Sequence, residues 1–266
     1  MHFDLNLSER YDGVAAEFWG LMGGNRPEAD LPFFEQAIRA GGGRALDLTC
    51  GSGKHLIPYL QAGLDVEGVD GSQPLLDACQ SRADAIGRKP ALYCQLMQAL
   101  DLPHRYHTIF ISVGSFHLLK EREEAMETLR RCHRHLLPGG KLYLTAYRPA
   151  GADDPNLRKR WTMGPVTRPE DNATMNVQCW IEHVDGENQL VTQRRTYVIT
   201  QPGRPARIQE AVLYQRWYGL DELKAMFASA GFTDVFVHRD FSPEPATEWK
   251  DWLVFRGTKS EGANKH

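Results

Sequence analysis

Two acids and two glycines lie close together in the first third of the chain, at a spacing that suits ligand binding. The stretch ALDLTCGSGKHL, residues 45–56, places Asp47 inside an apolar run and Gly51 and Gly53 directly after it. Asp70 ends the next apolar run, 17 positions after Gly53. A buried acid needs a partner, and an acid at the end of the second strand of such a unit can accept both hydroxyls of a ribose. The pattern predicts a nucleoside-like ligand whose cationic group is bound by Asp47.

Three ligands compete for this glycine loop. A phosphate-binding loop has the pattern GxxxxGK[ST], but here Lys54 is followed by His55 and no glycine lies at position 48. A dinucleotide fingerprint, GxGxxG, needs a third glycine where this chain has Leu56. The third ligand, S-adenosylmethionine (SAM), needs close approach to the backbone but no pyrophosphate cradle. Either NAD or SAM could use Asp70, and the loop favours SAM.

Alternating strands and helices must position these residues. Short apolar runs are separated by helical stretches, at the spacing of βα units, which predicts a doubly wound, mostly parallel sheet with helices on both faces. A capping serine, Ser72, begins one of the helices, and Asp30 is expected to cap an earlier one. The apolar runs cover residues 44–48, 65–70, 91–96, 108–113 and 141–147.

The pattern changes after Pro149. Three strand-like runs, 174–184, 188–200 and 206–218, are separated by Asp-Gly and Pro-Gly turn signals, which predicts an inserted antiparallel sheet of three strands. We expect one domain over 1–266, with a helical cover (1–40), a cofactor-binding core (41–148), the insertion as acceptor pocket (149–218), a closing helix and strands (219–257) and a polar tail (258–266).

Composition excludes several classes of protein. The chain has no run of about 18 apolar residues, which a membrane-spanning helix would need. The N-terminus lacks the layout of a signal peptide. The net charge of −3 gives no electrostatic reason to bind a polyanion. Five scattered cysteines without a CxxC pair are typical of reduced thiols in the cytoplasm, where we expect this protein.

Taken together, the motifs resemble the class I SAM-dependent methyltransferases, of the bacterial small-molecule type. The resemblance covers nearly the whole chain, through YDGVAAEFW, LDLTCGSGKH, VEGVDGSQPLLDACQ, the segment from 92 to 119, LLPGGKLYL and RWYGLDELKAMFASAGF. It implies a Rossmann-like fold, SAM as cofactor with S-adenosylhomocysteine as product, a nitrogen or oxygen of a small molecule as acceptor, no metal, and a monomer or homodimer. Three positions depart from the family pattern: Thr49 replaces a glycine, Leu96 replaces an acid, and His107 replaces an aspartate.

The resemblance also implies a set of site residues. His117, after the fourth strand, and Tyr147, after the fifth, are the candidates for catalysis, although His117 could equally be a satisfied core histidine. Phe116, Arg148, Arg216 and Trp217 are expected to line the acceptor pocket. The residues expected to bind the cofactor are Tyr11, Trp19, Asp47, Gly51, Gly53, Asp70, Gly71, Leu96, Met97 and Ser112.

Other functions remain open at this point. The chain could be a SAM-binding regulatory or scaffold protein, or a methyltransferase of RNA or protein. The basic clusters at 129–137 and 158–160 are the features that nucleic acid would use. Acids precede the first cluster on the same helix, so we expect a solvated face of mixed charge there, and no nucleic-acid or membrane partner.

Overall fold

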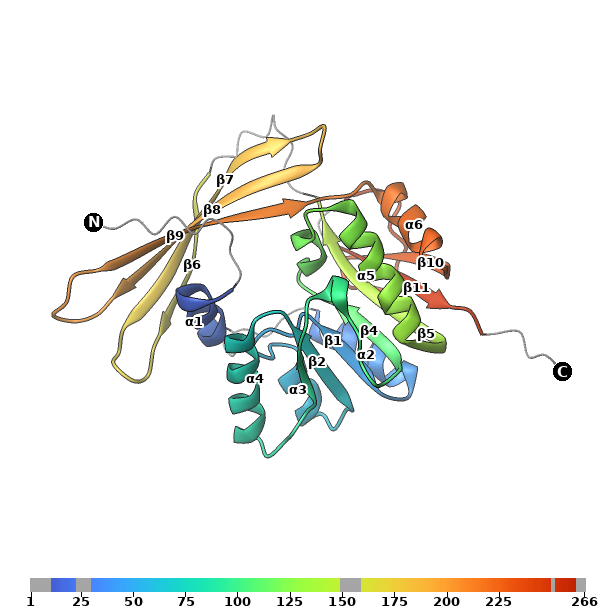
Figure 1. Ribbon diagram of the computed structural model, residues 1–266, viewed down its shortest axis with the longest axis horizontal. Coiled ribbons are helices and arrows are strands. Elements are labelled where there is room, and N and C mark those ends of the chain that lie inside the picture. Colours follow the sequence, from blue (N-terminus) through green and yellow to red (C-terminus); the bar gives the residue numbers. More distant parts are fainter. Residues whose placement is uncertain (1–10, 23–29, 149–158, 250–251, 262–266) are drawn as a thin grey trace.

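Two separate sheets make up the protein. The computed structural model describes residues 11–22, 30–148, 159–249 and 252–261. Within them, one sheet has seven strands and the other has four. Figure 1 shows the four-stranded sheet lying across one end of the α/β body, at the top left of the view.

The seven-stranded sheet has the order β10-β11-β5-β4-β1-β2-β3. Its pairings from β5 to β3 are parallel, whereas β11 pairs antiparallel with both β5 and β10. The chain connections diverge between β1 and β4, where ligands bind in open α/β sheets. The strands are β1 (Ala45–Leu48), β2 (Val66–Asp70), β3 (Leu92–Cys94), β4 (Tyr106–Ile111), β5 (Leu136–Tyr147), β10 (Phe232–Arg239) and β11 (Trp252–Lys259).

Helices cover both faces of this sheet, as the alternating runs predict. Side chains alternate between the faces of a strand, so Ile109 and Ile111 of β4 pack with α5 and α6 while Phe110 packs with α2 and α3. Short turns η1 and η2 follow β3 and β4. The helices are α2 (Leu31–Gly41), α3 (Leu56–Gln61), α4 (Gln73–Ala85), η1 (Met97–Ala99), η2 (Ser115–Leu118), α5 (Arg122–His135) and α6 (Leu220–Ser229).

The antiparallel sheet has one strand more than the sequence predicts. Its order is β6-β7-β8-β9, with β6 (Trp161–Thr167), β7 (Thr174–Asp185), β8 (Leu190–Thr200) and β9 (Arg207–Arg216). The additional strand, β6, contains Gly164 and Pro165, which argue against a strand in sequence. It forms because β6 is an edge strand that pairs only with β7, and the pairing shifts register between Met163 and Val166.

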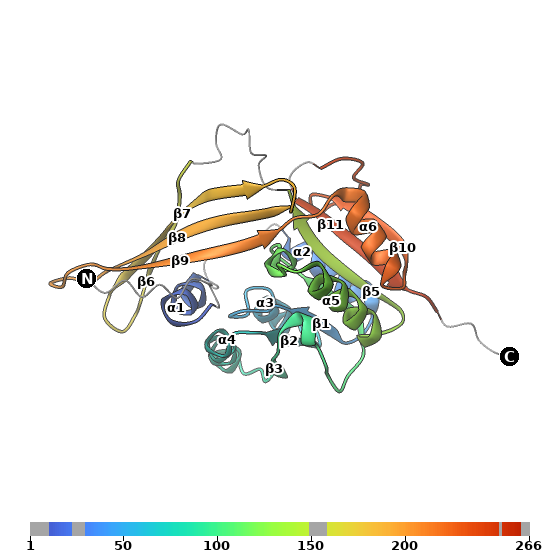
Figure 2. The same ribbon diagram turned by 45° about the horizontal axis from the view of Figure 1, so that its top comes forward.

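Helix α1 (Gly13–Met22) joins the two sheets. Figures 1 and 2 both show it beneath the antiparallel sheet and beside α4. Its buried Val14 and Phe18 pack against the antiparallel sheet, with the Phe18 ring 5.9 Å from the ring of Tyr197 on β8. The antiparallel sheet therefore shares a core with the helix predicted to cover the cofactor.

Local signals at helix ends have mixed outcomes. The Ser72 hydroxyl caps α4 by accepting the N–H of Leu75, as predicted. Asp30 precedes α2 but makes no side-chain cap, and its carboxylate contacts His55 instead. Strand β11 continues to Lys259, two residues into the predicted tail, and residues 262–266 of that tail lie outside the described residues.

Candidate functional site

The predicted loop lies between the ends of β1 and α3, at the edge of the sheet where β1, β2 and β4 end. Thr49 and Cys50 both donate N–H groups to the Val69 carbonyl, at 2.7 and 2.9 Å, which turns the chain sharply out of β1. Gly51 has φ +53° and Gly53 has φ +84°, a conformation that favours glycine. A Cβ on Gly53 would lie 2.7 Å from the Cys79 sulfur, so the loop packs against α4 only because this residue is glycine.

Asp70 holds this loop closed at the end of β2. Its Oδ2 accepts the Gly51 N–H at 2.8 Å and its Oδ1 accepts the Ser72 N–H at 2.9 Å. Burial raises the pKa of Asp70, and the backbone hydrogen bonds oppose that rise. Each carboxylate oxygen has two lone pairs, so acceptor capacity remains for ligand hydroxyls beside the loop.

Asp47 is the buried acid that the loop encloses. Its side chain is on β1, the residue is 1% exposed, and neither oxygen has a well-formed hydrogen bond with the described residues. Burial raises its pKa from 3.8 to about 7, with His55 opposing the shift and Asp70 adding to it. A buried carboxylate in this state is stabilised by a cationic partner.

Buried polar atoms in the loop, on α1 and before α2 also lack partners among the described residues. They are Thr49 Oγ1 in the loop, Trp19 Nε1 on α1 and Asp30 Oδ1 before α2. Buried polar groups in folded proteins are almost always hydrogen-bonded to protein, water or ligand. Both donors and acceptors are present in this set, which fits the charged aminobutyryl end of SAM.

Apolar side chains are also exposed after two other strands of this sheet, β3 and β4. Leu96, before η1, is 56% exposed, and Val113, after β4, is 48% exposed. Met97 is buried beneath Leu96, and a Cβ at Gly71 would lie 2.8 Å from a Leu96 methyl group. Large exposed apolar side chains at a strand edge suit a flat ring such as adenine. Leu96 thus offers apolar contact where the family pattern has an acid.

Main-chain carbonyls anchor the predicted cover. The Ser72 hydroxyl donates to the Tyr11 carbonyl at 2.6 Å, and the Ser52 hydroxyl donates to the Trp19 carbonyl at 3.2 Å. The Tyr11 and Trp19 rings meet edge to face, with centroids 6.2 Å apart. The guanidinium of Arg195, on β8, lies 5.5 Å from the centre of the Trp19 ring. The structure therefore brings Tyr11 and Trp19 to the glycine loop, as the resemblance implies.

His117 does not have the geometry of a general base. It is 2% exposed, and its Nδ1 lies 2.6 Å from the Arg216 carbonyl while its Nε2 accepts the Tyr147 N–H at 3.1 Å. A carbonyl accepts and an N–H donates, so the ring is neutral with its proton on Nδ1. Burial lowers its pKa to about 4 against the effect of the Arg216 carbonyl. His117 is a structural link between η2, β5 and β9, and its catalytic role stays a prediction that this geometry does not favour.

Two of the four predicted acceptor-pocket residues are structural as well. Phe116 is fully buried and packs against Tyr218, with ring centroids 5.7 Å apart. The guanidinium of Arg216 donates to the carbonyls of Lys120 and Asn188, at 2.5 and 2.6 Å. Neither side chain is available to line a pocket, because each is used to pack β9 against η2.

The other two predicted acceptor-pocket residues, Arg148 and Trp217, are more exposed than Phe116 and Arg216. Arg148 follows β5 at the sheet edge and is exposed, whereas Trp217 follows β9 and is half-buried. Both stay predictions for the acceptor pocket.

Tyr147, the other predicted catalytic residue, lies at the end of β5. Its ring packs on His117 and Trp252, with centroids 4.5 and 5.0 Å away. Burial raises its pKa to about 12, while a hydrogen bond from Gln215 opposes the rise. At neutral pH the phenol keeps its proton, so it can form hydrogen bonds with the molecule that is methylated but cannot remove a proton from it.

A polar chain beneath the loop was not predicted from sequence. Asp30 Oδ2 lies 2.9 Å from His55 Nε2, and Ser112 Oγ lies 3.3 Å from His55 Nδ1. All three residues are buried. The only local signals are that Asp30 precedes an apolar helix and that His55 follows the glycine loop, and neither signal pairs them. Ser112 was predicted on other grounds, as a cofactor residue.

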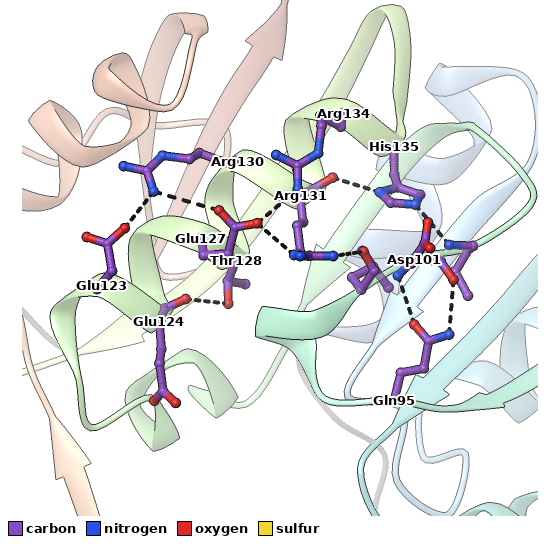
Figure 3. A network of polar contacts seen from close by, with 12 residues as sticks. Gln95, Asp101, Glu123, Glu124, Glu127, Thr128, Arg130, Arg131, Arg134 and His135 are labelled. Atoms are coloured by element: carbon purple, nitrogen blue, oxygen red, sulfur yellow. Dashed lines mark hydrogen bonds and ion pairs between the residues drawn. The ribbon is translucent and has the colours of Figure 1, made fainter.

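The basic cluster of α5 is a face of mixed charge, as predicted. Glu127 forms ion pairs with Arg130, Arg131 and Arg134, and Arg130 also pairs with Glu123 (Figure 3). The second cluster, 158–160, is only partly within the described residues. There the guanidinium of Arg160 lies 4.6 Å from the centre of the Trp180 ring.

Other expectations concern metals, cysteines and membranes. Among the described residues, no three His, Cys, Asp or Glu side chains gather in a way that could hold a metal ion. None of the five cysteines is in a disulfide. No helix in the described part of the chain is long and apolar enough to cross a membrane.

Comparison with known proteins agrees with this geometry. Residues 45–140 match a protein family described as a methyltransferase domain. The chain is 32% identical over 142 residues to the cypemycin N-terminal methyltransferase of a Streptomyces species; the match covers 53% of this chain and 57% of that protein, a little over half its length.

Two solved structures share the fold over almost the whole chain. A SAM-dependent methyltransferase from Clostridium acetobutylicum is similar with a TM-score of 0.73 at 14% identity, covering 95% of this chain and all of that one. The sugar N-methyltransferase KedS8 from a Streptoalloteichus species is similar with a TM-score of 0.71 at 18% identity, covering 98% of this chain and all of that one. These similarities confirm the predicted Rossmann-like fold with its additional antiparallel sheet.

Proposed function

We propose that this chain is a class I SAM-dependent methyltransferase that methylates an amine of a small molecule, which the match of residues 45–140 to a methyltransferase domain and the shared fold support. The observation that carries the proposal is the pair of acids at adjacent strand ends. Asp47 is a buried carboxylate without a well-formed hydrogen bond to the described residues, and Asp70 holds the glycine loop beside it. Together they match the ammonium and ribose groups of one ligand.

Different residues of the chain would hold the different parts of the cofactor. Asp47 would bind its ammonium group, Asp70 its ribose hydroxyls, and Leu96 with Met97 its adenine ring. Bound SAM supplies a methyl group on a positively charged sulfur. Tyr11 and Trp19 would exclude water above it, and alignment of acceptor and methyl group is then the main contribution that the protein makes to the rate.

An amine is favoured over a hydroxyl because neither predicted catalytic residue, at the ends of β4 and β5, can act as a general base. A hydroxyl must lose a proton to become a good nucleophile, whereas a neutral amine attacks directly. Among the described residues at these strand ends, His117 has both nitrogens engaged and Tyr147 keeps its proton at neutral pH. The relatives named above include an N-terminal methyltransferase and a sugar N-methyltransferase, which supports the same choice.

Calorimetry with S-adenosylhomocysteine tests the cofactor site. We expect wild-type protein to bind it and Asp47→Asn to bind ~10- to 100-fold more weakly, the range for loss of a charged hydrogen bond. Asp65→Asn is the matched control, because Asp65 precedes the opposite end of β2 and pairs with Arg44. No binding by wild type, or equal binding by Asp47→Asn, would contradict the proposal.

A panel of amines and their hydroxyl analogues then tests the reaction. We expect mass spectrometry to show one added methyl group on amines only, together with release of S-adenosylhomocysteine. Methylation of hydroxyls alone would overturn the amine assignment. Tight binding with no turnover across the panel would favour the alternative of a SAM-binding regulatory protein.

A further inference from the structure

Three polar residues form a continuous buried chain from α2 to the end of β4. Asp30 precedes α2, His55 precedes α3 and Ser112 follows β4, so three separate elements meet. Asp30 Oδ2 and His55 Nε2 are 2.9 Å apart, and His55 Nδ1 and Ser112 Oγ are 3.3 Å apart. The exposed fractions of the three residues are 5%, 3% and 3%. Water has little access to them, so these hydrogen bonds determine which groups of the three side chains stay available.

The chemistry of a carboxylate gives the direction of the first hydrogen bond. A carboxylate has only lone pairs to offer, so His55 Nε2 carries a proton and donates it to Asp30. In the tautomer with its proton on Nε2 alone, the ring has a lone pair on Nδ1, which accepts the hydroxyl proton of Ser112. Aromatic rings of Phe34 and Phe110 stand edge-on to the His55 ring, with centroids 6.0 and 6.5 Å away, and hold it in place.

The Ser112 oxygen is therefore left with lone pairs alone. Asp47 pairs in register with Phe110 on the adjacent strand, and Ser112 lies two positions after Phe110, on the same face of the sheet. Among its neighbours, His55 most opposes the rise in the pKa of Asp47, so it lies close to both side chains. Two kinds of acceptor, a carboxylate and a hydroxyl oxygen, thus adjoin the end of the glycine loop.

We propose that Asp30 and His55 are positioning residues that hold Ser112 as a hydrogen-bond acceptor for the ammonium group of SAM, beside Asp47. The inference rests on the proposed function, because it assigns further residues to the same cofactor. An ammonium group has three N–H donors, and a single carboxylate does not satisfy all of them. Ser112 would accept one of these N–H groups.

The same residue types in the same order serve as a catalytic triad in hydrolases. For that role a serine needs backbone N–H groups beside it that are free to bind an oxyanion. The Gly114 N–H, two residues after Ser112, is already donated to the Thr145 hydroxyl at 2.8 Å. We therefore expect no hydrolysis of p-nitrophenyl acetate above background, and hydrolysis that Ser112→Ala abolishes would overturn the assignment.

Two ligands separate the ammonium site from the rest of the pocket. S-adenosylhomocysteine carries the ammonium group, whereas 5′-methylthioadenosine has the same adenosine and sulfur without it. By calorimetry, we expect Ser112→Ala to bind S-adenosylhomocysteine about tenfold more weakly and 5′-methylthioadenosine as wild type does. Ser81→Ala, on the exposed face of α4, is the control and is expected to change neither affinity.

A double-mutant cycle tests the role of His55. Gln at this position keeps an N–H for Asp30 but removes the acceptor for the Ser112 hydroxyl. His55→Gln should weaken binding of S-adenosylhomocysteine about as much as Ser112→Ala, and the double variant should be no weaker than either. A purely structural role would instead give additive losses for both ligands. Nitrogen NMR of the wild-type protein should show the His55 proton on Nε2.

The outcomes distinguish this inference from the proposed function. If the wild type binds neither ligand, the cofactor assignment fails. If it binds both and Ser112→Ala weakens both equally or neither, the cofactor assignment stands and the role of Ser112 is overturned. A His55 proton found on Nδ1 would also overturn it.

Discussion

Asp47 is the residue on which the cofactor site most depends, and its buried state has a consequence for stability. Its pKa is raised from 3.8 to about 7 by burial. Between these values the folded protein holds a proton that the unfolded chain releases, so the free energy of unfolding falls as the pH rises from about 4 to about 7. Without ligand, Asp47→Asn should lack this decline.

Urea unfolding of both proteins from pH 4 to pH 8 measures the difference. The wild type should lose stability relative to Asp47→Asn as the pH rises, and S-adenosylhomocysteine should restore it at pH 7. Parallel curves for the two proteins would show that Asp47 keeps an ordinary pKa.

Thr49 is the residue where the loop departs from the pattern of the methyltransferases that it resembles, and it is strained. Its φ is +80°, a region that costs a β-branched residue about 1–2 kcal/mol. Thr49→Gly should therefore raise the free energy of unfolding by about 1 kcal/mol. Thr162→Gly, at an exposed extended position in β6, should lower it by roughly 0.5–1 kcal/mol. Urea unfolding at constant pH compares the two, and a loss of stability in both would disprove strain at Thr49.

At this scale the sequence predicts local motifs well and distant contacts poorly. Asp47, Gly51, Gly53 and Asp70 were found because one loop and the next strand end contain them all. The contact of Asp30 with His55 spans 25 positions, and that of His55 with Ser112 spans 57. No local pattern records such contacts, so the sequence predicts only a helix cap at Asp30.

At the scale of elements, the return of β9 to the α/β body depends on His117 and Arg216. The His117 ring links the Arg216 carbonyl to the Tyr147 N–H, and the Arg216 guanidinium binds two carbonyls of its own. The sequence predicts His117 after the fourth strand but not these contacts, because a strand 99 positions away determines what the ring touches.

His117→Gln should destabilise the protein by about 1–3 kcal/mol, because it leaves a buried carbonyl and a buried N–H without good partners. The pH dependence should change too. The pKa of His117 is lowered from 6.5 to about 4, so the unfolded chain binds the extra proton between these values, and wild-type stability falls as the pH drops through this range.

Thermal or urea unfolding between pH 4 and pH 7 checks both effects. The variant should be less stable at pH 7 and should lack that part of the acid slope. The opposite result would be an unchanged stability together with a slower methylation whose pH profile no longer shows a pKa near neutrality. In that case His117 would be the base that the sequence suggested.

At the scale of the whole molecule, α1 connects the cofactor site with the antiparallel sheet. Phe18 is fully buried between them, and its ring meets that of Tyr197. Phe18→Ala should cost about 3–5 kcal/mol and weaken binding of S-adenosylhomocysteine, since Tyr11 and Trp19 are placed by the same helix. Phe236→Ala, on the edge strand β10, is the control: it should cost less and leave the affinity unchanged. Calorimetry measures the affinity and urea unfolding measures the stability. An unchanged affinity in Phe18→Ala would show that the position of α1 does not affect cofactor binding.

The overall architecture could be predicted because periodicity is strong in the core. The parallel strands, the helices on both faces and three of the four antiparallel strands follow from apolar patterning. Strand β6 was missed since Gly164 and Pro165 break its pattern, and an edge position tolerates both. The relation between the two sheets was not predictable, because it depends on packing between α1 and β8.

All four strands of the antiparallel sheet lie in one continuous segment of the chain, which begins after β5 and ends at Arg216 (Figure 1). The parallel strand order on either side of that segment does not depend on it. A replacement for this segment would therefore have to reproduce two sets of contacts: those of Tyr197 with Phe18, which position α1, and those of His117 and Arg216, which join β9 to the α/β body.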